Sequence, residues 1–137
     1  MDRLTMTVPG KAEYIGTVRI AVAHAAGQAG FDLEAIDDIK VAVSEACTNI
    51  VCHAHEGSDY NYEVILEVGE GAFSVTVRDF GAGFDPESYT EPDPGEVRSS
   101  GLGIFIIRTL MDEVDIESAP GSGATIHMTK RLRDKIA

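Results

Sequence analysis

The segment that most constrains the fold of this chain runs from Val41 to His55 and reads VAVSEACTNIVCHAH. In an α-helix, Glu45 and Asn49 would lie four residues apart and project from the same face. The neighbouring positions that could bury the rest of this helix are apolar or small: Ile39, Ala42, Val43, Ala46, Ile50 and Val51. Because charged groups are rarely buried without a partner, the pair predicts either a binding site or a narrow solvated stripe.

Length and composition are those of an ordinary globular protein. The 137 residues predict a single domain, 1–137, with 44% hydrophobic and 25% charged side chains. No apolar run approaches the roughly 18 residues that span a bilayer, and the N-terminal MDRLTMTVPG lacks the apolar core of an export signal. Cys47 and Cys52 would diverge by about 140° around one helix, which disfavours a disulfide. We therefore expect a cytoplasmic protein with reduced thiols and no membrane segment.

The formal net charge of −12 argues against nucleic-acid binding, which usually requires a basic patch. A short basic run between Lys130 and Lys135 is expected to flank a last strand. An acidic protein that binds an anion must use backbone N–H groups, a metal ion or a few placed cations. A basic protein partner would instead be attracted over distance.

The spacing of apolar residues predicts the element order β-α-α-β-β-loop-α-β-β. The expected strands cover 4–8, 60–68, 73–79, 114–118 and 124–132, and the expected helices cover 11–29, the segment after Asp32 that contains Glu45 and Asn49, and 102–111. Gly30 is expected to end the first helix and Asp32 to cap the second. Loops are expected at 55–59 and 84–100, with turns at 69–71 and 120–123. This order predicts the α+β class: a two-layer α/β sandwich with a mixed, mostly antiparallel sheet and helices on one face.

Three glycine-containing motifs carry candidate chemistry. In Asp79-Phe80-Gly81-Ala82-Gly83, a carboxylate after a strand can accept a hydrogen bond from a ligand amine, and the glycines let a flat ring approach. Ser99-Ser100-Gly101-Leu102-Gly103 leads into a helix whose first N–H groups can bind an anion. In Gly121-Ser122-Gly123-Ala124-Thr125, the last hydroxyl could bond a nucleobase. Taken singly, these motifs also fit a plain turn, a flexible hinge and an ordinary strand residue.

Histidines and cysteines near the first segment do not predict a zinc site. Cys47, Cys52, His53 and His55 match none of the spacings of structural zinc sites. A buried cysteine usually behaves as a small hydrophobic residue. His24 and His127 are interpreted as ordinary surface or half-buried residues.

The order of these motifs resembles the GHKL ATPase family, which includes gyrase, Hsp90, histidine kinases and MutL. VSEACTN at Val43–Asn49 and TLMDEV at Thr109–Val114 are most similar to its anti-sigma branch, the serine-protein kinases of the RsbW and SpoIIAB type. The resemblance extends from the first strand to Leu132. It implies the GHKL (Bergerat) ATP-binding fold and, as cofactors, ATP or ADP and Mg²⁺.

The resemblance also implies roles for individual residues at the adenine. Asp79 would accept a hydrogen bond from the adenine amino group, and Gly81 and Gly83 would leave room for the ring. Thr125 would support the adenine from the last strand.

A second set of roles concerns the phosphates and the transfer step. Asn49 would coordinate Mg²⁺, and Glu45 would act as the catalytic general base toward a serine or threonine hydroxyl. The remaining residues would contact the phosphates: Arg98, Ser100, Gly101, Leu102 and Gly103.

The partners implied by the resemblance are an anti-anti-sigma protein of the STAS type, as substrate, and a sigma factor that is sequestered. Family members act as dimers, so a homodimer is expected. Three functions follow as alternatives: a serine/threonine kinase that is also an anti-sigma factor, an ATP-gated anti-sigma or switch protein that transfers no phosphate, and the ATP-binding half of a histidine kinase. Glu45 favours the first alternative, and the length leaves no room for the dimerisation helices that the third requires.

Overall fold

The computed structural model describes residues 1–53, 60–79, 101–118 and 123–133. Its elements are β1 (Asp2–Pro9), a 3-10 turn η1 (Ala12–Tyr14), α1 (Ile15–Gln28), α2 (Leu33–His53), β2 (Asn61–Gly69), β3 (Ala72–Asp79), α3 (Gly101–Leu110), β4 (Glu113–Ser118) and β5 (Ala124–Arg131). This order confirms the predicted series of strands and helices. The predicted loops at 55–59 and 84–100, and most of the turn at 120–123, lie outside the described residues.

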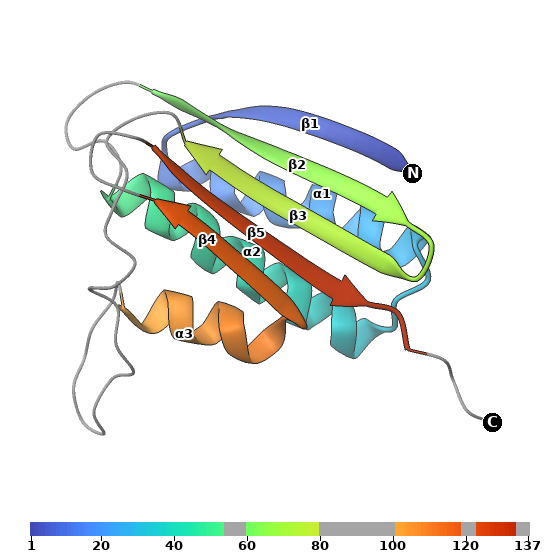
Figure 1. The fold of residues 1–137 in the computed structure, drawn as a ribbon. Helices are drawn as coiled ribbons and strands as arrows, with labels where there is room; N and C mark the ends of the chain where they lie inside the picture. The colour runs from blue at the N-terminus through green and yellow to red at the C-terminus, as the bar shows by residue number, and fades with distance from the viewer. Residues whose placement is uncertain (54–59, 80–100, 119–122, 134–137) are drawn as a thin grey trace.

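The strands form one five-stranded sheet in the order β1-β2-β3-β5-β4. Each of the four pairings is antiparallel, so the prediction of a mostly antiparallel sheet is confirmed, whereas the prediction that the sheet is mixed is wrong. The α-helices cover the same face of this sheet, which gives the predicted two-layer sandwich (Figure 1). Within the described ranges, no helix is both long enough and apolar enough to cross a membrane.

The hydrophobic core lies between the sheet and the helices. Alternate residues of β2 and β3 face the helices, and four of them are at most 2% exposed: Val64, Leu66, Val75 and Val77. Burying one such side chain stabilises the fold by about 1.5–3 kcal/mol. From the helix layer, α2 inserts Ile39, Ala42, Val43, Ala46 and Ile50, each 0% exposed, as its apolar spacing predicts.

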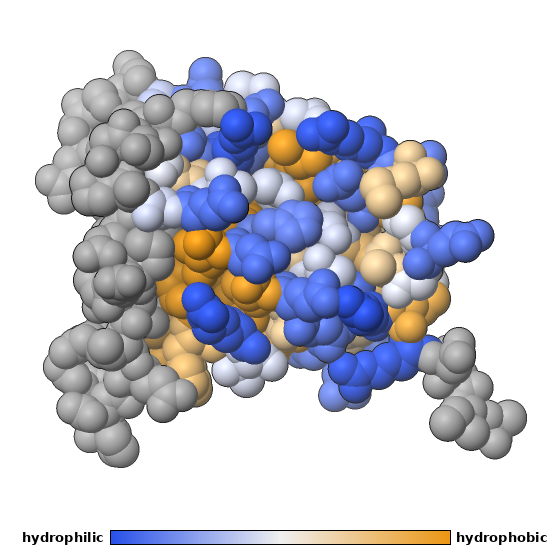
Figure 2. Space-filling view, in the orientation of Figure 1, coloured by the Kyte–Doolittle hydropathy of each residue, from blue (hydrophilic) through white to orange (hydrophobic). Residues whose placement is uncertain are grey.

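The opposite face of the sheet carries mainly hydrophilic side chains (Figure 2). The hydroxyl oxygens of Ser74 and Thr129 lie 3.0 Å apart, and Thr76 Oγ1 lies 2.7 Å from His127 Nδ1. Both hydrogen bonds join directly opposite residues of β3 and β5. The period of two along each strand therefore separates an apolar face under the helices from a polar outer face.

A tight connection joins α1 to α2. Gly30 has a φ of 102°, a conformation that favours glycine. Its N–H donates to the carbonyl of Gly27 at 3.1 Å, and the N–H of Phe31 donates to the carbonyl of Ala26 at 3.2 Å, which is a Schellman motif. Asp32 Oδ1 then accepts the N–H of Ala35 at 2.9 Å. The structure confirms both predicted helix boundaries.

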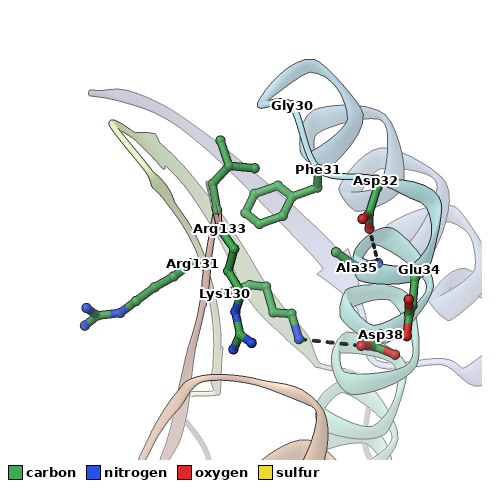
Figure 3. Close-up of a pocket in the computed structure, with 10 residues that line it drawn as sticks. Gly30, Phe31, Asp32, Glu34, Ala35, Asp38, Lys130, Arg131 and Arg133 are labelled. Atoms are coloured by element: carbon green, nitrogen blue, oxygen red, sulfur yellow. Dashed lines mark hydrogen bonds and ion pairs between the residues drawn. The ribbon is translucent and has the colours of Figure 1, made fainter. Parts of the chain in front are cut away.

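A groove of about 260 Å³ lies beside this connection, at the end of α2 far from Glu45 and Asn49 (Figure 3). Acidic residues at the start of α2 line one side of the groove, and basic residues at the end of β5 line the other. Lys130 Nζ lies 3.5 Å from Asp38 Oδ2 across the groove. This ion pair connects β5 to α2.

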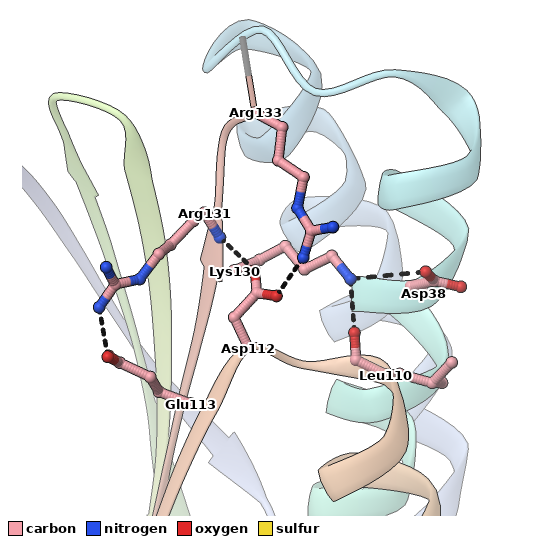
Figure 4. Close-up of polar contacts among 7 residues, drawn as sticks. All are labelled: Asp38, Leu110, Asp112, Glu113, Lys130, Arg131 and Arg133. Atoms are coloured by element: carbon pink, nitrogen blue, oxygen red, sulfur yellow. Dashed lines mark hydrogen bonds and ion pairs between the residues drawn. The ribbon is translucent and has the colours of Figure 1, made fainter.

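Asp112 connects the end of α3 to the same basic segment (Figure 4). Its carboxylate accepts the backbone N–H of Arg131 at 2.7 Å and a guanidinium N–H of Arg133 at 2.8 Å. Partial burial raises the pKa of Asp112, but these hydrogen bonds and the charges of Lys130 and Arg133 outweigh burial and hold the pKa below its ordinary value. The aspartate of the TLMDEV motif therefore has a structural role in this chain.

We predict that Asp112→Ala lowers the free energy of unfolding by about 1 kcal/mol at neutral pH, because two hydrogen bonds to a carboxylate are lost. The folded-state pKa is depressed, so the charge-dependent part of this stability is present above the unfolded pKa of about 3.9. It is lost as the pH falls through the folded pKa. Urea unfolding across pH should show the variant approaching the wild type below about pH 4.

The matched control is Asp37→Ala. Asp37, on α2, is another aspartate in an ion pair, 3.8 Å from Lys40, but its side chain is 73% exposed. We expect this change to cost less than about 0.5 kcal/mol. Equal losses for the two variants would contradict the structural role of Asp112.

Candidate functional site

One end of the sandwich gathers the elements that carry the predicted site residues. The last residue of β3, the start of β5, the C-terminal half of α2 and the first turn of α3 lie together at the left of Figure 1. Strands β3 and β5 are hydrogen-bonded neighbours, and α2 packs against both α3 and β3. Residues that are up to 79 positions apart in the sequence could therefore contact one ligand.

Glu45 and Asn49 on α2 face the first turn of α3. Asn49 is 3% exposed, and Glu45 is half-buried. A Cβ atom added to Gly103 would lie 3.0 Å from Glu45 Oε2 and 3.2 Å from Asn49 Nδ2. The two side chains therefore share one face, as predicted, and they meet the backbone of a second helix instead of forming a solvated stripe.

The first turn of α3 supplies hydrogen-bond donors. The helix begins at Gly101, so this residue, Leu102 and Gly103 form its first turn, which contains no acidic side chain. N–H groups in a first turn have no acceptor within the helix, and the helix dipole makes this end positive. Leu102 is 39% exposed, whereas Gly103 is buried. An anion at this end would meet backbone donors beside Asn49.

Asp79 lies at the end of β3 and is 2% exposed. It continues the alternation of Val75 and Val77, so its carboxylate is on the helix side of the sheet. A carboxylate in this position can accept a hydrogen bond from a ligand amine. Four other predicted contacts lie outside the described residues: Gly81, Gly83, Arg98 and Ser100.

Thr125 is the predicted site residue that the structure separates from the others. It pairs with Arg78, whereas Asp79 pairs with Ala124. Directly opposite residues share a face of the sheet, so the Thr125 side chain is on the outer face with Thr76 and His127. The expectation that Thr125 supports a base beside Asp79 is therefore wrong in geometry. The position beside Asp79 belongs to Ala124, which has no hydroxyl.

Cys47, between Glu45 and Asn49 on α2, is a core residue and not a reactive one. Its thiol is free and fully buried, and burial raises its pKa to about 12. The thiol is therefore protonated at neutral pH and is a poor nucleophile or metal ligand. Among the described residues, no group of three or more His, Cys, Asp or Glu side chains could hold a metal ion.

A magnesium ion could still be held here if a ligand supplied most of its oxygens. Mg²⁺ is commonly bound through one or two protein oxygens together with substrate phosphates and water. The buried Asn49 side chain lies beside the first turn of α3, where backbone donors would bind phosphate. The donor set therefore fits a metal–polyphosphate complex better than a bare ion.

Sequence comparison is consistent with this geometry. Residues 8–130 match the family described as histidine kinase-like ATPase domain. The chain belongs to this family. Within it, the chain is 40% identical over 144 residues to the serine-protein kinase RsbW of Listeria monocytogenes, with 98% of this chain and 90% of that protein covered. RsbW of Bacillus subtilis is 38% identical over 142 residues, with 96% and 86% covered. The histidine kinase-like ATPase domain therefore extends over nearly the whole chain.

Solved structures of family members share the fold. The RsbU and RsbW domains of a Mycobacterium tuberculosis protein match with a TM-score of 0.71 at 22% identity, over 96% of this chain and 32% of that one. The histidine kinase domain of a blue-light activated kinase from Erythrobacter litoralis matches with a TM-score of 0.61 at 25% identity, over 88% and 60%. The two-layer architecture is therefore that of the histidine kinase-like ATPases.

Gly103→Ala tests the contact between α3 and α2. Replacing glycine by alanine inside a helix normally stabilises it by up to about 1 kcal/mol. At Gly103 the new methyl group would crowd Glu45 and Asn49, so we predict no gain in thermal stability. The control is Gly16→Ala on α1, where an added Cβ would have nothing within 4 Å and the normal gain is expected. Equal gains in both variants would show that the site has room at Gly103.

Proposed function

We propose that this chain is an ATP-dependent serine/threonine protein kinase that phosphorylates an anti-anti-sigma protein of the STAS type and sequesters a sigma factor. The observation that carries the proposal is the convergence of Glu45 and Asn49 on Gly103, in the first turn of α3. An acid can serve as the base, an amide oxygen can bind a metal ion, and the positive end of a helix can bind phosphate, so these groups suit phosphoryl transfer. The names of the RsbW relatives, serine-protein kinases, support the same activity.

Nucleotide binding would use both layers of the fold. From the sheet, Asp79 accepts a hydrogen bond from the adenine amino group, beside the glycines at positions 81 and 83. From the helices, the N–H groups of Gly101 to Gly103 bind phosphate oxygens. Ser100 and Arg98 precede this turn and are proposed to contact the phosphates as well. Asn49 would hold Mg²⁺, which supplies charge neutralisation of the phosphates when bound.

Glu45 is proposed as the general base. Its carboxylate accepts the proton of a serine or threonine hydroxyl while the hydroxyl oxygen forms a bond to the γ-phosphorus. The bond from that phosphorus to the bridging oxygen breaks, and ADP carries away the electron pair. Glu45 is half-buried and lies beside Asn49 and Gly103, so a base and the phosphate-binding turn are adjacent.

The partners are proposed from chemistry and resemblance together. A net charge of −12 favours association with basic surfaces over distance. We also propose that the chain forms a homodimer and that it is cytoplasmic. A cytoplasmic location suits the buried thiol of Cys47, which forms no disulfide.

The alternative function is that of an ATP-gated switch that binds nucleotide and partners without transferring phosphate. Retention of Glu45 beside the phosphate-binding turn favours the kinase, because a pure binding protein has no need of a base.

We predict that Asn49→Ala weakens Mg²⁺-dependent ATP binding about tenfold or more, because a protein ligand of the metal is removed. Isothermal titration with ATP, with and without Mg²⁺, measures the effect. Thr48→Ala is the control, since that hydroxyl donates to the carbonyl of Ser44 within α2 at 2.8 Å. An unchanged Mg²⁺-dependent affinity in Asn49→Ala would remove this role from Asn49.

We also predict that Glu45→Ala retains ATP and sigma-factor binding but transfers phosphate about 10²–10⁴-fold more slowly. The assay incubates each variant with ATP and a candidate STAS protein and detects one added phosphate by intact mass. Glu34→Ala, which removes an exposed acid at the start of the same helix, should behave as the wild type. Wild-type rates in Glu45→Ala would exclude Glu45 as the base, and a wild type that binds ATP without transfer would favour the switch.

A further inference from the structure

Three strand ends form a row of side chains on the helix side of the sheet. Asp79 of β3 pairs with Ala124 of β5, and Ala124 pairs with Ser118 of β4. Directly opposite residues share a face, so all three side chains lie on the side that the helices cover. Asp79 and Ala124 are 2% exposed, and Ser118 is half-buried. The row therefore begins with a carboxylate, continues over a methyl group and ends with a hydroxyl.

The hydroxyl groups of Thr125 and Ser118 lie on different faces of the sheet. Thr125 pairs with Arg78 and Glu117, so its side chain is on the outer face of the sheet. Ser118 is one strand farther from Asp79 than Ala124, but it is on the same face as the carboxylate. Among the residues paired along this row, Ser118 is the one that can offer a hydroxyl to a ligand bound by Asp79.

The spacing suits a flat bicyclic base. Adjacent strands are ~4.8 Å apart, so Asp79 and Ser118 are separated by ~10 Å along the row. Two hydrogen bonds of ~3 Å, one from each end, would leave ~4 Å between the two ligand atoms that they reach, which suits two polar atoms of one base. Asp79 can only accept hydrogen bonds when ionised, whereas a serine hydroxyl can also donate one. The two ends of the row thus match an exocyclic amine and a ring nitrogen.

We propose that Ser118 is a specificity-determining residue that donates a hydrogen bond to a purine ring nitrogen while Asp79 accepts one from the amino group. The inference rests on the proposed nucleotide site. It replaces the outward-facing Thr125 by a residue on the correct face of the sheet. The small Ala124 side chain lies between these two polar residues in the row.

The test is isothermal titration of ADP into wild type, Ser118→Ala and Thr125→Ala. Loss of one neutral hydrogen bond predicts about fivefold weaker binding to Ser118→Ala. Thr125→Ala should bind ADP as the wild type does, because its hydroxyl is on the other face. Equal weakening of both variants, or none in Ser118→Ala, would overturn the inference.

Purine analogues separate recognition from a structural effect. ADP analogues in which carbon replaces N1, N3 or N7 each remove one ring acceptor. The affinity for one of the three should be the same in wild type and Ser118→Ala, because the partner of the hydroxyl is already missing. A uniform loss for ADP and all three analogues would overturn the inference. If the wild type itself binds no ADP, the proposed nucleotide-binding function fails. If the wild type binds ADP and Ser118→Ala binds it equally well, only the proposed role of Ser118 fails.

Discussion

The close packing of α3 against α2 at Gly103 is the contact on which the candidate site depends. Because Gly103 has no Cβ, the first turn of α3 can approach Glu45 and Asn49 at a distance where even a methyl group would be crowded. The positive end of a helix is thereby placed beside an acid and an amide in a partly dehydrated setting. Fixed dipoles in such a setting stabilise developing charge more effectively than water, which has to reorient.

The sheet decides which residues can join this site, through the period of two along each strand. Asp79 is on the helix side because Val75 and Val77 before it belong to the core. One residue of difference in register separates Ala124, beside Asp79, from Thr125 on the outer face. A register shift by one residue would expose the core, so the burial of Ile126 and Met128 also fixes the orientation of Thr125.

Much of this architecture could be predicted from local patterns, and the failures have a physical cause. Gly30 and Asp32 mark helix ends because their conformations and hydrogen bonds are local. The alternation of Ala124, Ile126 and Met128 with polar residues also indicates the outer face for Thr125, whereas the Gly121–Thr125 motif alone does not specify a face. The contact of Gly103 with Glu45 joins residues 58 positions apart, and the role of Asp112 depends on Lys130 and Arg131 of β5 and on Arg133, which follows that strand. Such distances depend on tertiary packing, which no local pattern encodes.

Contacts of Lys130, at the end of β5 far from the candidate site, help to fix the positions of α2 and α3. Lys130 on β5 lies 3.5 Å from Asp38 on α2 and donates to the carbonyl of Leu110, at the C-terminus of α3, at 2.5 Å. A cation at a helix C-terminus is favourable because that end of the dipole is negative. One side chain thus links β5, α2 and α3, the three elements that also meet at the candidate site. Since a helix of ten residues is ~15 Å long and stiff, fixing the end of α3 at Leu110 also limits where its first turn can lie relative to Glu45 and Asn49.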